Sequence, residues 1–321
     1  MKLVTYSSRE HGENQPRVGA LTADGRGVVD LHSPHRDDLV AAGADAMRAV
    51  TLADAVFGDM VALIEAGPTG LETARAILDR CSAEGSPSRL GREAVRLEVP
   101  LRPPRLRDCI AWETHIRNFY EKFTGGPVPE AYYKIPVYYK GNHTTVFAHD
   151  EDVPWPSYSS KWDYELELGL VIGSAAVDVP AAQAESHIFG LTCFNDFSAR
   201  DTLQLEMAVG LGPSKGKDFA NAIGPCITTI DEFPDLYDIK MQARINDEVW
   251  SSGGTSDIHW RFDQIIERMS LSEPLIAGEI VGSGTIGYGC GLELDRFLQD
   301  GDVVELEIEG IGTLRNRVVA A

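Results

Sequence analysis

Two glutamates are separated by one residue in the apolar segment 162–173. On a β-strand alternate side chains share a face, so Glu165 and Glu167 would lie about 7 Å apart and aim at one place. Carboxylates that are buried together need a cation or a proton between them. Spacing alone does not identify a site, because Glu305 and Glu307 repeat the pattern in what we interpret as a solvated strand face.

Two aspartates are candidates to complete a set of metal ligands. Asp196 follows a predicted strand at 191–194, where a role in turn formation is the structural alternative. Asp108 precedes a predicted helix at 110–123, which it would otherwise cap. Oxygen donors of this kind favour a hard cation, Mg²⁺ or Mn²⁺ with Ca²⁺ as a further candidate, over zinc or copper.

Two basic side chains are candidates for acid–base or electrostatic roles. His115 borders the apolar stripe of the predicted helix, where it either faces a cleft or packs like an ordinary core or surface histidine. Lys217 lies in the loop 211–219, whose glycine and hydroxyl positions do not fit a phosphate-binding loop. We interpret this loop as one that presents Lys217 beside a metal, and a solvated lysine is the alternative.

A glycine-rich loop at 282–287 matches the pattern GxGxxG. Further glycines follow at once and little chain remains, so we reject a nucleotide-binding βαβ unit. We expect the backbone at Gly284 and the hydroxyl of Thr285 to contact a small carboxylate ligand. Glu293 follows this loop, and its spacing alone does not distinguish it from a surface acid.

The chain divides into two parts at the proline-rich segment 99–104, which interrupts regular structure. We expect a small N-terminal α+β domain over 1–100 and a catalytic domain over 101–321. The first contains a hairpin at 18–31 and helices at 46–66 and 70–82. The second is mostly β, with predicted strands at 134–140, 163–172, 190–195, 224–230, 238–246 and 303–309, and short helices at 110–123, 180–188, 198–208 and 259–270. The strands and helices do not alternate, so a β-rich α+β roll fits better than a doubly wound sheet.

Composition limits the partners of the chain. A net charge of -20 over 321 residues disfavours nucleic acid and anionic membrane surfaces. No apolar run approaches the roughly 20 residues of a membrane span, and no signal peptide is recognisable. The five cysteines are scattered without CxxC spacing, which indicates reduced thiols in a cytoplasmic protein.

Together the motifs resemble those of the fumarylacetoacetate hydrolase family over residues 105–317. The matching segments are YELELGLVIG, NDFSARD, GKDF and SGTIGYGCGLEL, which appear in the family's order. By this resemblance Glu165, Glu167 and Asp196 align with the family's metal ligands. Lys217 aligns with its active-site lysine, and Glu293 with the acid that follows its glycine–threonine loop.

The resemblance implies more than the residues show by themselves. It implies a mixed β-sandwich roll, a smaller preceding domain and a homodimer. It assigns Asp108 as the fourth metal ligand and a His115–Glu293 dyad that activates water, and it aligns Tyr139 and Arg200 with substrate contacts.

The chain departs from the fumarylacetoacetases at three substrate positions. Leu203 replaces a glutamine, Asn221 a threonine and Ile110 a tyrosine. We therefore expect a bacterial family member that acts on another small anionic oxo acid, with Asn221 still among the substrate contacts.

The expected reaction is metal-dependent hydrolysis of a C–C bond in an acylpyruvate-type 1,3-diketo acid through a metal-stabilised enolate. The first alternative is a decarboxylase, dehydratase or isomerase of a 2-oxo acid that uses the same enolate. The family's decarboxylases carry an acid three residues after the histidine, and here that position is Asn118. The second alternative is a catalytically silent ligand-binding homologue.

Overall fold

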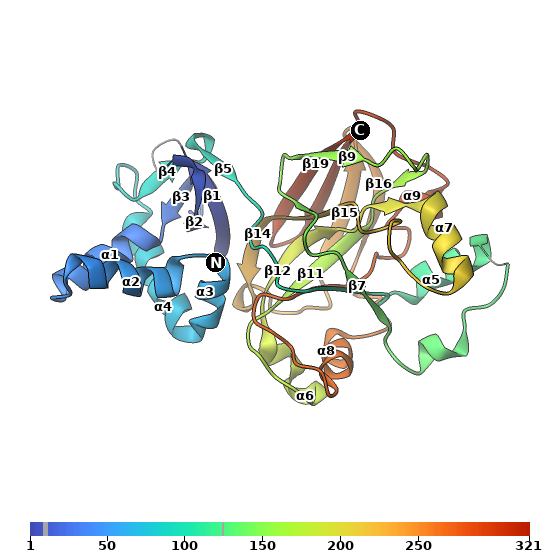
Figure 1. Cartoon of the computed structure of the whole chain (residues 1–321), viewed down its shortest axis with the longest axis horizontal. Coiled ribbons are helices and arrows are strands. Elements are labelled where there is room, and N and C mark those ends of the chain that lie inside the picture. The colour runs from blue at the N-terminus through green and yellow to red at the C-terminus, as the bar shows by residue number, and fades with distance from the viewer. Residues whose placement is uncertain (9–11, 124) are drawn as a thin grey trace.

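The computed structural model describes residues 1–8, 12–123 and 125–321, without the side chains of 12–14 and 123. It is a strand-rich α+β fold, as predicted, in which N-terminal elements gather at one end and the remaining strands form two facing layers (Figure 1). Within the described residues, every helix is too short or too polar to cross a bilayer.

The N-terminal part contains the predicted hairpin and helices. Strands β2 (Gly12–Leu21) and β3 (Gly27–Asp30) pair antiparallel. The single helix expected over 46–66 is wrong, because Asp59 accepts a hydrogen bond from the backbone of Ala62 and starts a new helix. The helices among the described residues of this part are α1 (His32–Ala41), α2 (Ala46–Phe57), α3 (Met60–Glu65) and α4 (Gly67–Cys81).

A 12-stranded sheet runs through both parts of the chain. Its order is β4 (Arg89–Gly91), β3, β2, β1 (Lys2–Ser8), β14 (Asn221–Thr229), β12 (Ile188–Asn195), β11 (Leu166–Ile172), β17 (Ile280–Gly282), β6 (Leu106–Cys109) and β7 (Tyr138–Gly141), with β5 (Val95–Leu97) on β1 and β8 (Val146–Phe147) on β14. The β1–β14 pairing joins the N-terminal strands to the rest. The division into domains at residue 100 stays a prediction.

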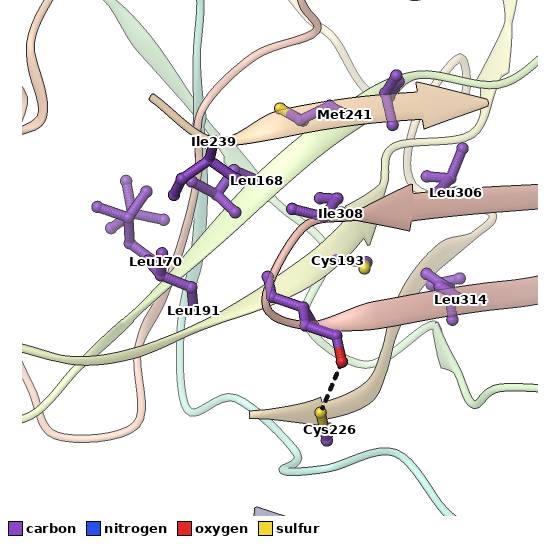
Figure 2. Packing of buried hydrophobic residues seen from close by; sticks show 14 of the residues in the cluster. Leu168, Leu170, Leu191, Cys193, Cys226, Ile239, Met241, Leu306, Ile308 and Leu314 are labelled. Carbon is purple, nitrogen blue, oxygen red and sulfur yellow. Dashed lines mark hydrogen bonds between the residues drawn. The ribbon is translucent and has the colours of Figure 1, made fainter. Parts of the chain in front are cut away.

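A five-stranded sheet packs on the large one and closes the sandwich. Its order is β16 (Glu248–Gly254), β15 (Lys240–Ile245), β18 (Val303–Ile308), β19 (Gly312–Ala320) and β9 (Asp152–Trp155), and a small third sheet pairs β10 (Trp162–Asp163) with β13 (Ser198–Ala199). Figure 2 shows Leu168 of β11 near Ile239 and near Ile308 of the facing sheet, and Leu170 of β11 beside Leu191, all in one buried cluster. The apolar face of the Glu167 strand is therefore the core side, as its alternation indicates.

Short helices cover the sandwich and carry site residues. They are α5 (Glu113–Phe123), α6 (Ala181–Ala184), α7 (Arg200–Val209), α8 (Phe262–Ser270) and α9 (Gly291–Leu294). The continuous strand expected over 163–172 is wrong. It is interrupted at residues 164–165, where Glu165 forms only an isolated bridge with Cys290.

Candidate metal centre and active site

Three buried carboxylates converge from separate elements. Asp108 lies on β6, Glu167 on β11 and Asp196 directly after β12, and one oxygen from each lies within 4.8 Å of the other two. Asp108 is therefore a strand residue and not the cap of a helix. The sheet brings these positions together although they are far apart in the chain.

The glycine-rich loop clamps two of these carboxylates. The backbone N–H of Gly284 donates to Asp108 Oδ1 and to Glu167 Oε2, both at 3.0 Å. Gly284 has a φ of +78°, and a Cβ there would lie 2.5 Å from the carbonyl oxygen of Cys109. Only glycine fits this conformation and this close approach.

Burial and mutual repulsion perturb the whole cluster. Burial, reinforced by the charge of Asp196, raises the pKa of Asp108 to about 7. Burial also raises the pKa of Asp196 to about 6 although Lys217 opposes the shift, and it holds the pKa of Glu167 well above its usual range. Three such carboxylates are tolerated together when protons or a cation neutralise them.

The donor set fits a hard divalent cation. Glu167 Oε1 and Asp196 Oδ1 are buried and have no hydrogen-bond partner among the residues that the structure describes. Buried polar atoms are normally paired, so these two oxygens indicate a ligand that carries positive charge. Oxygen donors alone favour Mg²⁺ or Mn²⁺ over softer metals.

Glu165 is held differently from the other three acids. Its carboxylate accepts hydrogen bonds from Lys217 and, at 2.7 Å, from Arg200. Burial would raise its pKa, but these two cations lower the pKa of Glu165 to about 2. Lys217 also donates to Asp196 Oδ2 at 2.5 Å, so the lysine links Glu165 to the cluster. The metal-ligand roles of Asp108, Glu165, Glu167 and Asp196 stay predictions.

A histidine–glutamate pair lies beside the carboxylates. His115 Nδ1 is 2.9 Å from Glu293 Oε2, which joins α5 to α9. Burial opposes ionisation of Glu293, yet its bond to His115 holds the pKa of the carboxyl below its usual range. An ionised carboxylate only accepts hydrogen bonds, so Nδ1 donates to Glu293, and in the neutral imidazole Nε2 is then the nitrogen that can act as a base.

Glu293 has further donors that the sequence analysis did not identify. Asn118 Nδ2 donates to Glu293 Oε1 at 2.8 Å, and the backbone of Tyr288 donates to the same oxygen at 2.9 Å. Asn118 thus occupies the position three residues after His115 as a partner of the acid. Its one-turn spacing from His115 on the helix was the available signal.

Asp163 is a second residue that the sequence analysis missed. Its carboxylate accepts from the backbone of Gly291 at 2.7 Å and of Leu292 at 3.0 Å, at the start of α9. It also accepts from Arg200 Nε at 2.6 Å, and Arg200 in turn holds Glu165. Asp163 therefore connects α9, which carries Glu293, through Arg200 to Glu165.

A cavity of about 360 Å³ opens onto these groups. The predicted site residues that line it are Asp108, His115, Tyr139, Glu165, Glu167, Arg200, Lys217, Gly284 and Thr285. The Tyr139 hydroxyl donates to Asp196 Oδ2 at 2.6 Å, and the Thr285 hydroxyl donates to the carbonyl of Leu166 at 3.3 Å.

Asn221 is the predicted substrate contact that the cavity lining does not include. It is buried at the start of β14, where its Nδ2 donates to the carbonyl of Asn142 at 3.2 Å. Its substrate role stays a prediction. Glu305 and Glu307, on the partly exposed β18, accept hydrogen bonds from Arg244. This second pair of alternating glutamates therefore has the surface role expected for it.

The fold and the clustered carboxylates define a class of α+β enzymes that depend on a divalent metal. A family model described as "Fumarylacetoacetate (FAA) hydrolase C-terminal" matches residues 108–319. The chain belongs to the fumarylacetoacetate hydrolase family, and it is an enzyme of oxo-acid chemistry in the general sense of that family.

Individual relatives differ in their reactions. The oxaloacetate tautomerase YisK of Bacillus subtilis (strain 168) is 30% identical over 228 residues, covering 70% of this chain and 73% of the relative. The fumarylacetoacetate hydrolase of Exiguobacterium antarcticum shares the fold with a TM-score of 0.73 and 24% identity, both chains being covered completely. So does the maleylpyruvate hydrolase of Sphingobium sp. SYK-6, solved in complex with manganese(II) ion and pyruvate, with a TM-score of 0.71, 20% identity and complete coverage of both chains.

Proposed function

We propose that the chain hydrolyses a C–C bond of an acylpyruvate-type oxo acid with the help of Mg²⁺ or Mn²⁺. The observation that carries this proposal is the His115–Glu293 pair beside three convergent carboxylates, with His115 and two of the carboxylates lining one cavity. A base and a metal centre in one cavity are the parts that water attack on a carbonyl requires.

The residues of the chain divide the work as follows. Asp108, Glu167 and Asp196 hold the cation, with Glu165 proposed as the fourth ligand. When bound, the cation supplies Lewis-acid charge to the oxygens of the substrate.

His115 Nε2 takes a proton from water while Glu293 stabilises the imidazolium that forms. The hydroxide adds to the acyl carbonyl, and the bond between that carbon and the C3 methylene breaks. The products are a carboxylate and the enolate of pyruvate. Protonation of the enolate at C3 then gives pyruvate. Lys217, which also lines the cavity, adds positive charge where the enolate develops.

The test uses acylpyruvate, Mn²⁺ and ¹⁸O-labelled water. Hydrolysis puts one labelled oxygen into the released carboxylate, and His115→Ala should lower the rate about 10²–10⁴-fold. His143→Ala, at an exposed histidine, is the matched control and should retain the parent rate. Unlabelled products, or a His115→Ala rate within threefold of the parent, would contradict the proposal.

A tautomerase or isomerase of a 2-oxo acid is the second candidate. The similarity to the tautomerase of Bacillus subtilis favours it, because keto–enol exchange needs a base and a cation but no attacking water. Two results together would favour this second function: the protein enolises oxaloacetate but the His115→Ala variant does not, and the protein does not cleave acylpyruvates. We further propose that the enzyme is a cytoplasmic homodimer whose acidic surface keeps it from nucleic acid and membranes.

A further inference from the structure

The part of the cavity beyond the carboxylates has mainly apolar walls, with Tyr120 and Tyr132 among them. A volume of about 360 Å³ lies in the range of small-molecule sites, about 300–1,000 Å³. The apolar side chains in its lining include Ile116, Phe119, Ala131, Val137, Leu203 and Met207. They come from α5, from the segment before β7 and from α7, so the wall is built by elements that flank the metal centre.

The cations of the cavity lie at its carboxylate end. Within the described part of the lining, the permanently charged ones are Arg200 and Lys217. Arg200 already pairs with Asp163 and Glu165, and Lys217 with Glu165 and Asp196. A second carboxylate held against this wall would therefore lie among mainly apolar side chains without a cation to pair with, which is unfavourable.

We propose that the substrate has one acidic end and an uncharged apolar tail that packs against α5 and α7. This inference rests on the proposed function and names its substrate class: oxo acids with an aliphatic or aromatic substituent, in preference to dicarboxylates. Burial of apolar surface should favour the longer tail by about fourfold per methylene until the wall is filled.

Met207 and Leu203 are the specificity-determining residues of this wall. They lie one turn apart on α7 and both line the cavity. Met207 is 48% exposed, so a charged side chain at this position does not have to be buried for the protein to fold. Leu205 on the same helix is 73% exposed and is not part of the lining, which makes it a matched control.

The experiment measures binding, so it does not depend on which reaction the enzyme catalyses. Dissociation constants of pyruvate, 2-oxohexanoate and 2-oxohexanedioate are measured by calorimetry on the Mn²⁺-loaded protein. We expect 2-oxohexanoate to bind several tens of fold more tightly than pyruvate. We expect it to bind at least tenfold more tightly than the dicarboxylate of the same length.

Met207→Lys places a cation at the wall and should reduce or reverse the preference against the dicarboxylate. Leu205→Lys should leave the preference unchanged, and Leu203→Gln, which adds no charge, should weaken only the gain from the tail. Equal or tighter binding of the dicarboxylate by the parent protein would overturn the inference. So would binding of none of the three acids, or equal effects of Met207→Lys and Leu205→Lys. Tail selectivity without ¹⁸O incorporation would instead overturn the proposed hydrolysis alone.

Discussion

At Asp108, burial and a neighbouring carboxylate act in the same direction on one acid. Both raise its pKa, to about 7, while the cations around Glu165 lower the pKa of that acid to about 2. Two carboxyl groups that line one cavity thus differ widely in how readily they ionise. This contrast depends on burial and on specific partners, which no spacing rule in the sequence contains.

The metal-free protein should become less stable as the pH rises from 5 to 8. The folded pKa of Asp108 lies above its unfolded value, so its contribution to stability is present at low pH and is lost as the pH passes about 7. Asp108→Asn mimics the neutral acid and should be more stable than the parent at pH 8, by an amount that shrinks towards pH 5. Urea unfolding with chelator at each pH measures this. A parent–variant difference independent of pH would contradict it.

Asp163→Asn should separate positioning from simple stability. The substitution weakens the hydrogen bonds that position 163 accepts from the backbone of α9 and from Arg200. Glu293 and Glu165 are therefore held less firmly in their orientations. Supporting residues around a metal centre typically contribute about 10–100-fold in affinity or activity. We expect losses of that size in kcat and in Mn²⁺ affinity, with Asp163→Glu giving partial rescue. Asp152→Asn, which breaks a surface pair with Arg317, is the control.

At the scale of elements, strands were easier to predict than their limits. The alternation of leucines predicted the β11 region because one face is core. The strand breaks before Leu166, where Glu165 forms an isolated bridge with the distant Cys290, and no local pattern indicates that partner. Helix α1 was missed because Pro34 is its one buried residue, which gives no periodic stripe. The contacts of Asn118 and Asp163 join segments more than 100 residues apart, which local patterns cannot reveal.

The loop at Gly284 should tolerate no side chain. Gly284→Ala adds a Cβ against the backbone of Cys109 and disturbs the N–H that holds Asp108 and Glu167. We expect a stability loss of about 1–3 kcal/mol and at least a tenfold loss of Mn²⁺ affinity. Gly25→Ala has a similar positive φ with open space around it, so it should reproduce the strain without the loss of metal binding. Metal titration and thermal unfolding of both variants provide the comparison.

At the scale of the whole molecule, the proposed metal centre can exist only in the folded chain. Its three clustered acids come from β6, β11 and the end of β12, so an unfolded chain has no equivalent site. Binding to the folded state alone raises the free energy of unfolding with ligand concentration.

Mn²⁺ at 100 times its dissociation constant should therefore stabilise the protein by about 2.7 kcal/mol. The shift in Tm should disappear in Asp196→Asn, which removes a clustered carboxylate, and persist in Glu305→Gln on the surface strand. Equal shifts in both variants would place the cation elsewhere.

The bonds of Asp163 also have an evolutionary consequence. One carboxylate serves both the first turn of α9 and the guanidinium that holds Glu165. A lineage that abandons Glu293 on α9 still needs Asp163 to hold Arg200, and one that alters Arg200 or Glu165 still needs it for the start of α9. Substitutions at position 163 are therefore tolerated only if Arg200 and the start of α9 change together. New reactions on this fold should arise first from substitutions in the apolar wall of the cavity.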